Sequence, residues 1–307
     1  MSRRVVLLSG GVGGARLVRG FEQLDDVETA VVVNVGDDES FYGLHVSPDV
    51  DTVMYTAAGV EGADGWGRAG DTSVLMEHLT ALGVDTRFRI GDADAALNMY
   101  RTMRLGAGDP LHEIIASLTE TLGLNCRVIP ATNDTLRTQV CNERDQWLSF
   151  QEYFVLRQQR DGVTDIRFTG SSSAMAAPGV VDVIRAADAV IIGPSNPPLS
   201  VWPILSIRAV ANAVAQAKRV IAVSPLFGGR ALKGPADRVM ASLGLPPGNA
   251  GVLAAYEGLL DDLVIDVGDG HERKGLASGG VSVQIGETRI AEAAEAGAFA
   301  TWLMELL

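Results

Sequence analysis

The chain has 307 residues, of which 47% are hydrophobic, and a formal net charge of −13 at pH 7. This length and apolar content predict a folded protein with a large core and exclude a disordered chain. The excess of acidic residues argues against nucleic acid and anionic membranes as partners, because too few cations are present to neutralise rows of phosphates. We also expect no membrane span and no signal peptide, because the apolar runs are short. The two cysteines, Cys126 and Cys141, lack metal-like spacing and fit reduced thiols of a cytoplasmic protein.

The first predicted element is a strand over residues 5–8, which a glycine-rich turn joins to a helix. Glycine lets backbone N–H groups approach an anion, because no Cβ stands in the way. The turn matches neither common nucleotide fingerprint. Arg16 stands where a dinucleotide-binding loop starting at Gly11 would have its third glycine, and the Gly-Lys-Ser/Thr of a P-loop is absent. The pattern predicts a phosphate-binding turn or simply close packing of strand and helix. The glycines concerned are Gly10, Gly11, Gly13 and Gly14.

A second strand is predicted over residues 29–35, and polar side chains gather at its end. Asn34, Asp37 and Asp38 lie there, while Asp49 and Asp51 come just before the next predicted helix. Carboxylate oxygens at the carboxyl end of a strand suit Mg²⁺. A solvated acidic loop, and a helix N-cap at Asp49 or Asp51, are the structural alternatives.

The following stretch predicts loops and helices rather than strands. A glycine-rich loop contains Trp66, and helices are predicted over residues 74–82, 95–104 and 110–122. Arg89 stands among apolar neighbours in an extended piece of chain. A guanidinium in such a position often binds a ligand.

Residues 125–170 differ in character from the rest of the chain. Short strands with polar turns are predicted over residues 127–130, 136–141, 146–157 and 165–169. This pattern indicates a small antiparallel insertion on the main sheet rather than a separate domain.

A buried strand over residues 190–192 ends in a proline-rich turn, and a long helix is predicted over residues 199–218. In an open parallel sheet, ligands bind beyond such strand ends, where side chains and the free N–H groups of a helix start meet. A plain strand-to-helix turn is the alternative. The candidate binding residues of this turn are Gly193, Pro194, Ser195 and Asn196.

The last third of the chain continues the alternation of strands and helices. A strand over residues 219–223 ends at Ser224, which is a further candidate for nucleotide contact. The remaining predicted elements are helices at 180–187, 236–243, 252–259 and 290–307 and a strand at 263–267.

This alternation predicts an α/β fold, a three-layer Rossmann-like and mainly parallel sheet with helices on both faces and a small antiparallel β insertion. We expect one domain over residues 1–307, with the β-rich insertion at about 125–170. The strand ends that carry Gly, Pro, Ser and Asp are then expected to gather on one rim of the sheet.

Several motifs, in this order, resemble one family. They are Ser9-Gly10-Gly11-Val12-Gly13-Gly14, Asn34 with Asp37-Asp38, Ser47-Pro48-Asp49-Val50-Asp51-Thr52-Val53, Gly193-Pro194-Ser195-Asn196-Pro197, and Ser224-Pro225 with Gly234-Pro235. The family is the 2-phospho-L-lactate transferases of coenzyme F-420 biosynthesis, which include phosphoenolpyruvate transferases in actinobacteria. The likeness runs from Val5 to about Asp266 and is weaker from Gly268 onward.

The resemblance implies a metal-dependent transfer, and carboxylate ligands suit Mg²⁺ as the metal ion. The substrates would be the 5-deazaflavin Fo and a guanosine-diphosphate-linked three-carbon acid, either a phospholactyl or a phosphoenolpyruvyl donor, and GMP would be released. A homodimer is expected from the resemblance alone.

The site residues implied are as follows. Asp37 and Asp51 would bind the metal and act in catalysis, and Asp51, Arg89 and Asn34 would contact the deazaflavin. The glycine loop, the turn at Gly193 and Ser224 would hold the nucleotide. We expect Asp51→Ala to abolish transfer while changing the stability by about 1 kcal/mol or less, as for an accessible site residue.

Two other functions compete with this one. An NAD(P)-dependent oxidoreductase is disfavoured by Arg16 in place of the third glycine. A non-catalytic nucleotide-binding regulator on the same fold remains the alternative, although the intact Ser-Pro-Asp-x-Asp-Thr segment favours the transferase. Deazaflavin binding distinguishes the transferase from both.

Overall fold

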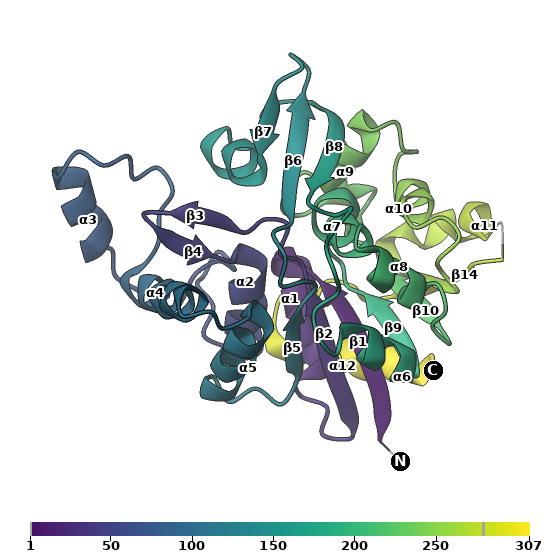
Figure 1. Cartoon of the computed structure of the whole chain (residues 1–307). Coiled ribbons are helices and arrows are strands. Elements are labelled where there is room, and N and C mark those ends of the chain that lie inside the picture. Colours follow the sequence, from purple (N-terminus) through teal and green to yellow (C-terminus); the bar gives the residue numbers. More distant parts are fainter. Residues whose placement is uncertain (1, 278–279) are drawn as a thin grey trace.

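The computed structural model describes residues 2–277 and 280–307 and is built on one seven-stranded sheet (Figure 1). Every pair of neighbouring strands in this sheet is parallel. The order across the sheet is β14 (Ser282–Gly286), β13 (Asp262–Asp266), β10 (Val220–Val223), β9 (Ala189–Ile192), β1 (Arg3–Ser9), β2 (Val27–Val33) and β5 (Arg127–Pro130).

The strand order reverses between β1 and β9. From β1 the chain builds outward through β2 to β5, and from β9 it builds in the opposite direction. Leu8 pairs with both Val32 and Ile192, so the strand ends at Ser9 and Gly193 lie side by side. Such a reversal leaves a crevice above the carboxyl ends of the strands, where open α/β sheets bind ligands.

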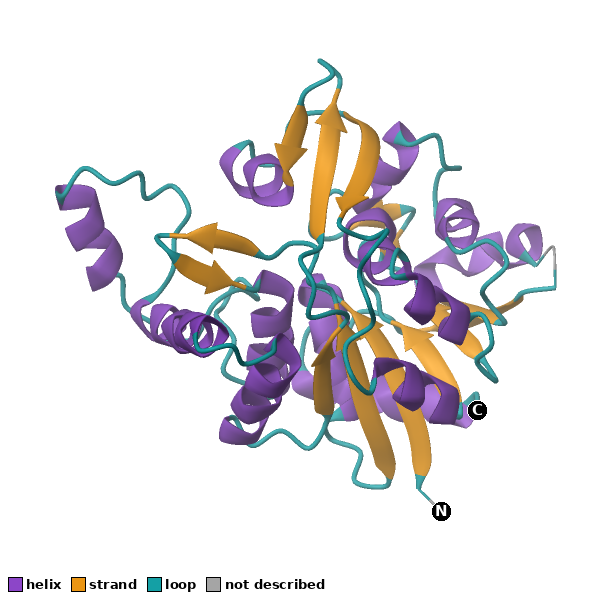
Figure 2. Cartoon of the chain, in the orientation of Figure 1, coloured by secondary structure: helices purple, strands orange, loops and turns teal. Residues whose placement is uncertain are grey.

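Helices cover both faces of the sheet (Figure 2). Behind it, α1 (Gly11–Phe21) packs against α2 (Pro48–Ala57) and α12 (Ala293–Glu305), and in front of it α6 (Val180–Ala186) packs against α8 (Arg208–Val214). The strands are buried on both faces, which explains their nearly continuous β-branched sequences. The predicted three-layer α/β fold is therefore confirmed.

The remaining helices surround these layers. Within the described residues, no helix combines the length and apolar content that crossing a membrane requires. The helices that surround the layers are α3 (Val74–Ala81), α4 (Asp92–Gly106), α5 (Leu111–Thr121), α7 (Trp202–Leu205), α9 (Ala236–Ser242), α10 (Asn249–Ala255) and α11 (Arg273–Leu276).

A three-stranded antiparallel sheet stands above the carboxyl ends of the main strands (Figure 1). It consists of β6 (Arg137–Asn142), β7 (Trp147–Ser149) and β8 (Val163–Thr169). The strand β5, which was predicted as part of this insertion, instead pairs in parallel with β2 in the main sheet. Its apolar residues are buried there, as an edge strand of the core requires.

Two predicted elements are interrupted in the structure. The strand predicted over 146–157 ends at Ser149 and continues as the π-helix η1 (Glu152–Leu156), because Phe150, Tyr153 and Phe154 pack together at helical spacing. The helix predicted over 199–218 is divided into the π-helix η2 (Pro197–Val201), α7 and α8. Pro203 has no N–H to donate, and Ile207 is extended, so one continuous helix is excluded.

Short elements extend the molecule around the rim. The hairpin of β3 (Glu39–Phe41) and β4 (Leu44–Val46) projects sideways with α3 beyond it (Figure 1). A second hairpin, β11 (Leu226–Phe227) and β12 (Arg230–Ala231), follows β10, and the 3-10 helix η3 (Val267–Glu272) follows β13. The strand β14 was not predicted, because only Val283 and Ile285 in it are large and apolar.

Candidate active site

A pocket of about 810 Å³ opens at the point where the strand order reverses. Its walls come from the glycine loop, the acidic loop after β2, the start of α2, the insertion and the turn after β9. Residues from the last stretch of the chain, 288–291, also line it. The rim expected from the sequence is thus one continuous site.

The glycine loop and the turn after β9 touch through their backbones. A Cβ on Gly13 would overlap the carbonyl oxygen of Pro194, and one on Gly14 would overlap the hydroxyl of Ser195. Close packing therefore explains these two glycines. The residues of the two turns that also line the pocket are Gly10, Gly11, Gly13, Pro194, Ser195 and Asn196, whereas Gly14 and Gly193 lie behind it.

Asp49 caps the first turn of α1 rather than its own helix. Its Oδ1 accepts a hydrogen bond of 2.7 Å from the backbone N–H of Gly11, and its Oδ2 accepts one of 2.9 Å from Asn34 Nδ2. Asn34 also accepts from the N–H of Gly36. Asn34, predicted as a deazaflavin contact, is fully buried and supports Asp49 from behind the pocket.

Ser224 also lies behind the pocket rather than on its surface. Its hydroxyl donates a 2.5 Å hydrogen bond to Asn249 Oδ1 and accepts one from the N–H of Leu226. The side chain is completely buried in this network, and the neighbouring Pro225 lines the pocket instead.

Four aspartates form what we call the acidic floor: Asp37, Asp49 and Asp51, which line the pocket, and Asp38, which lies outside its lining. Each is at most 5% exposed. Asp38 Oδ2 accepts hydrogen bonds of 2.9 Å from His45 and Ser47. Asp37 Oδ1 and Asp38 Oδ1 are buried and have no hydrogen-bond partner among the described residues.

Asp51 is paired with a buried cation. Arg101 of α4 is completely buried and donates to both carboxylate oxygens of Asp51, with 3.2 Å between its Nη1 and Oδ2. Removing one partner of a buried ion pair typically costs about 3–5 kcal/mol, because the other charge is left uncompensated. The structure therefore revises the expectation for Asp51→Ala: its stability should fall well beyond 1 kcal/mol.

An aromatic wall formed by Trp66, Phe150 and Phe154 lines the same pocket as Asp37, Asp49 and Asp51. The rings of Phe150 and Phe154 are stacked with centroids 5.1 Å apart, and Trp66 meets Phe154 edge-on at 6.2 Å. All three line the pocket, and Trp66 is 41% exposed. A flat apolar ring has a surface to stack on here.

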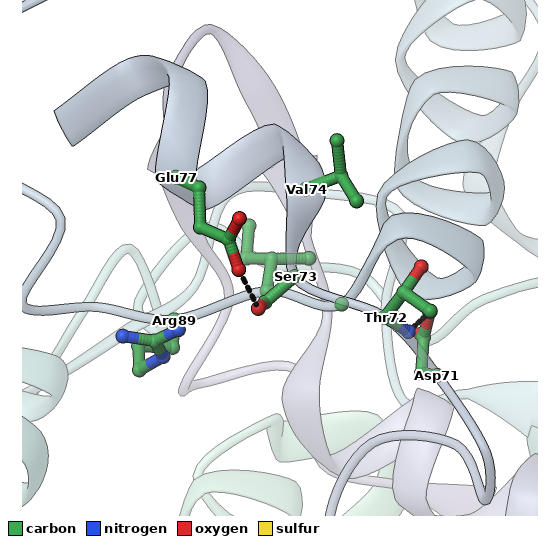
Figure 3. Close-up of a pocket in the computed structure, with 8 residues that line it drawn as sticks. Asp71, Thr72, Ser73, Val74, Glu77 and Arg89 are labelled. Atoms are coloured by element: carbon green, nitrogen blue, oxygen red, sulfur yellow. Dashed lines mark hydrogen bonds between the residues drawn. The ribbon is translucent and has the colours of Figure 1, made fainter. Parts of the chain in front are cut away.

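Arg89 lines the pocket, as predicted, and also a neighbouring hollow of about 440 Å³. Figure 3 shows Arg89 at one side of this hollow, Asp71 and Thr72 at the other, and the hydrogen bond from Ser73 to Glu77 between them. The two cavities share Arg89 and Gly91 in their linings.

Comparison with known proteins decides the family. A family model described as "2-phospho-L-lactate transferase CofD" matches residues 5–296. The chain belongs to the 2-phospho-L-lactate transferase family. It is therefore a transferase of coenzyme F-420 biosynthesis.

Individual relatives support this assignment. A 2-phospho-L-lactate transferase of Methanococcus maripaludis is 37% identical over 276 residues, covering 88% of this chain and 89% of the relative. A phosphoenolpyruvate transferase of Streptomyces coelicolor is 38% identical over 286 residues, covering 91% of this chain and 90% of the relative. The crystal structure of BH3568 from Bacillus halodurans, of the UPF0052 family, has a TM-score of 0.67 at 16% sequence identity. The match covers 98% of this chain and 99% of BH3568. It shares the fold.

Three of the transferase's buried carboxylates, Asp37, Asp49 and Asp51, bind protons more tightly than ordinary aspartates do. Burial raises the pKa of Asp49 and of Asp51 from 3.8 to about 6. Burial and the charge of Asp49 raise the pKa of Asp37 well above its usual range. These carboxylates repel one another in a dry environment, and either protons or a metal ion would relieve the repulsion.

The donor set fits Mg²⁺ only if substrate completes it. Across residues 2–277 and 280–307, no three His, Cys, Asp or Glu side chains are arranged as a metal site. Mg²⁺ commonly keeps several waters and binds through one or two carboxylates together with substrate phosphates. The unpartnered Oδ1 of Asp37 is suited to that role.

Sequence reasoning missed three cations that line the pocket, Arg16, Arg87 and Arg289. Arg16 stands one turn into α1, and no hydrogen bond or ion pair joins its side chain to another described residue. Its place directly after the glycine loop was the available signal. Arg289 stacks on the ring of Phe227 at 5.1 Å and comes from the C-terminal stretch, where the family likeness was weak.

Proposed function

We propose that this enzyme transfers a phospholactyl or phosphoenolpyruvyl group from a guanosine-diphosphate-linked donor to the ribityl hydroxyl of Fo and releases GMP. The observation that supports this most is one pocket that unites the glycine loop, the acidic floor and the aromatic wall. A diphosphate, a metal ion and a flat ring each have a matching surface in it.

The donor would bind along the glycine loop and the turn after β9. The N-terminus of α1 supplies backbone N–H groups and a positive dipole end, which favour phosphate. The N–H of Gly11 already donates its hydrogen bond to Asp49. The N–H groups of the next residues in α1 would therefore bind the phosphates of the donor substrate. Arg16 is a candidate to neutralise a phosphate, because it lines the same pocket as the glycine loop.

The acceptor would stack its ring on the aromatic wall. Its ribityl chain would then extend toward Asp51 and Arg89, which line the same pocket. Trp66 is partly exposed at the mouth, as a residue that covers an entering ring would be.

The reaction is an in-line displacement at phosphorus. The ribityl hydroxyl oxygen bonds to the phosphorus that carries the three-carbon acid, the bond from that phosphorus to the GMP oxygen breaks, and GMP leaves. Asp51 would accept the hydroxyl proton, and its pKa of about 6 suits a base that works near neutral pH. Positioning and charge neutralisation supply most of the rate enhancement in such transfers.

Asp37 and Asp51 are the residues proposed to hold Mg²⁺. Of the two, Asp37 has the free oxygen, whereas Arg101 already engages Asp51. When bound, the metal ion would neutralise diphosphate oxygens. We therefore assign Asp37 chiefly to the metal and Asp51 chiefly to the hydroxyl.

A turnover assay tests the proposal. Purified protein is mixed with Fo, Mg²⁺ and either lactyl- or enolpyruvyl-diphosphoguanosine, and the deazaflavin product is resolved by mass. Product with one donor supports the transfer and identifies the acid. No product with either donor, despite Fo binding, favours the nucleotide-binding regulator. The homodimer and the cytoplasmic location stay predictions, to be tested by light scattering and cell fractionation.

A further inference from the structure

We propose that Arg101 is a positioning residue that orients Asp51 toward the acceptor hydroxyl; this inference rests on the proposed function. Asp51 lines the pocket, whereas Arg101 lies behind it and is completely buried. Arg101 therefore has no direct access to substrate. Any effect on catalysis must pass through the carboxylate that it holds.

Three elements fix the guanidinium in place. Nη1 donates to Asn98 Oδ1 at 2.7 Å on α4, to the backbone oxygen of His45 at 3.2 Å on β4, and to Asp51 on α2. Nη2 donates to the other oxygen of Asp51. Arg101, which is itself held in place, thus hydrogen-bonds to both oxygens of the Asp51 carboxylate.

These two hydrogen bonds matter because a carboxylate without them rotates freely about its last side-chain bond. A planar guanidinium fork fixes the plane of the carboxylate, whereas a lysine ammonium would attract it without defining its orientation. With the plane fixed, the lone pairs of Asp51 that are not used by Arg101 keep one direction. A base must lie within hydrogen-bond reach of the proton it takes, so its orientation controls the chemical step.

The discriminating variant is Arg101→Lys, which retains the charge and removes the fork. We expect kcat to fall by about 100-fold, the loss typical of a misplaced catalytic group. The KM for each substrate should stay within about threefold, because Arg101 does not line the pocket. Arg104→Lys is the matched control: Arg104 lies one turn further along α4 and pairs with Asp109 at the surface. Its kcat should remain that of the wild type.

A double-mutant cycle separates positioning from a general structural role. In the background of Asp51→Asn, the Arg101→Lys change should lower kcat by less than about threefold, because the group it acts through is already disabled. If Arg101→Lys lowered kcat by the same factor in the Asp51→Asn background as in the wild type, the proposal would be overturned. An Arg101→Lys enzyme with the wild-type kcat would also overturn it.

A milder variant keeps the test valid if Arg101→Lys fails to fold. Asn98→Ala removes one hydrogen bond to the guanidinium, together with those that Asn98 Nδ2 donates to Asp94, and leaves the ion pair intact. We expect a fall in kcat of about fivefold with unchanged KM, and an unchanged kcat would count against positioning. Wild-type enzyme is assayed in parallel. Inactive wild type overturns the proposed function together with this inference, whereas active wild type with an equally active Arg101→Lys overturns this inference alone.

Discussion

Gly13 and Pro194 are in backbone contact across the point where the strand order reverses, so that no side chain fits between them. This contact joins the two turns that follow β1 and β9. It holds the N-terminus of α1 against the turn that contributes Ser195 and Asn196 to the pocket.

Gly13→Ala should therefore damage both the fold and the site. The added methyl overlaps the Pro194 carbonyl, and overpacking of this kind costs about 1–3 kcal/mol. We expect a lower free energy of unfolding and weaker nucleotide binding. Urea denaturation and calorimetric titration with GDP measure the two effects.

The matched control is Gly106→Ala. Gly106 is the last residue of α4, and a Cβ there meets no described atom within 4 Å. Its stability should rise by up to about 1 kcal/mol, because alanine favours the helix. Equal stabilities for the two variants would show that the contact with Pro194 is unimportant.

Asp37→Asn should make the metal-free protein more stable but weaken its use of Mg²⁺ in the transfer. The change removes a buried carboxylate whose Oδ1 has no partner among the described residues, so the metal-free protein should gain about 1 kcal/mol of stability. Transfer should fall by at least about 100-fold, and saturation should require more Mg²⁺, because an oxygen ligand is lost. Magnesium titrations of the rate measure this. Asp182→Asn on α6, outside the pocket, should leave the Mg²⁺ dependence unchanged.

Stability of the metal-free protein should fall as the pH rises from about 4 to 7. Burial raises the pKa of Asp49 and of Asp51 from 3.8 to about 6, so the folded state binds protons more tightly than the unfolded state. The resulting stabilisation is complete below pH 3.8 and is lost as the pH rises through about 6. We expect melting temperatures a few degrees higher at pH 5 than at pH 7.5.

Saturating Mg²⁺ should reduce this pH dependence, because the metal compensates the same charges. Calorimetry with and without chelator checks the sign. A metal-free protein that melts higher at pH 7.5 than at pH 5 would contradict the assigned electrostatics of the acidic floor.

Trp66→Ala should weaken acceptor binding more than donor binding. An aromatic contact contributes about 0.5–1.5 kcal/mol, so the Kd for Fo should rise by about 2- to 13-fold. Fluorescence titration with Fo measures this, with GDP affinity as the internal reference. Trp147→Ala is the control, since Trp147 lies on β7 and outside the pocket. Equal effects of the two variants would argue against stacking on Trp66.

The sequence by itself was sufficient for the fold class and for the gathering of the turns at one edge of the sheet. Buried β-branched runs such as Val31 to Val33 require a sheet covered on both faces, and the turns after β1 and β9 must then share one edge. These properties are local, because each depends on a residue and its immediate neighbours. Element boundaries failed where local patterns compete, as at Pro203 and in η1.

Only the tertiary structure decided what each polar side chain does. Asp51 and Arg101 are 50 residues apart in the chain, and packing of α4 against β4, which directly precedes α2, brings them together. Asn34 and Ser224 follow strand ends as binding residues do, yet both are buried behind the pocket, whereas Arg289 enters it from the last stretch of the chain. A carboxylate can bind a metal, accept a proton or close an ion pair. Its partners decide among these roles, and those partners come from distant segments that no local pattern specifies.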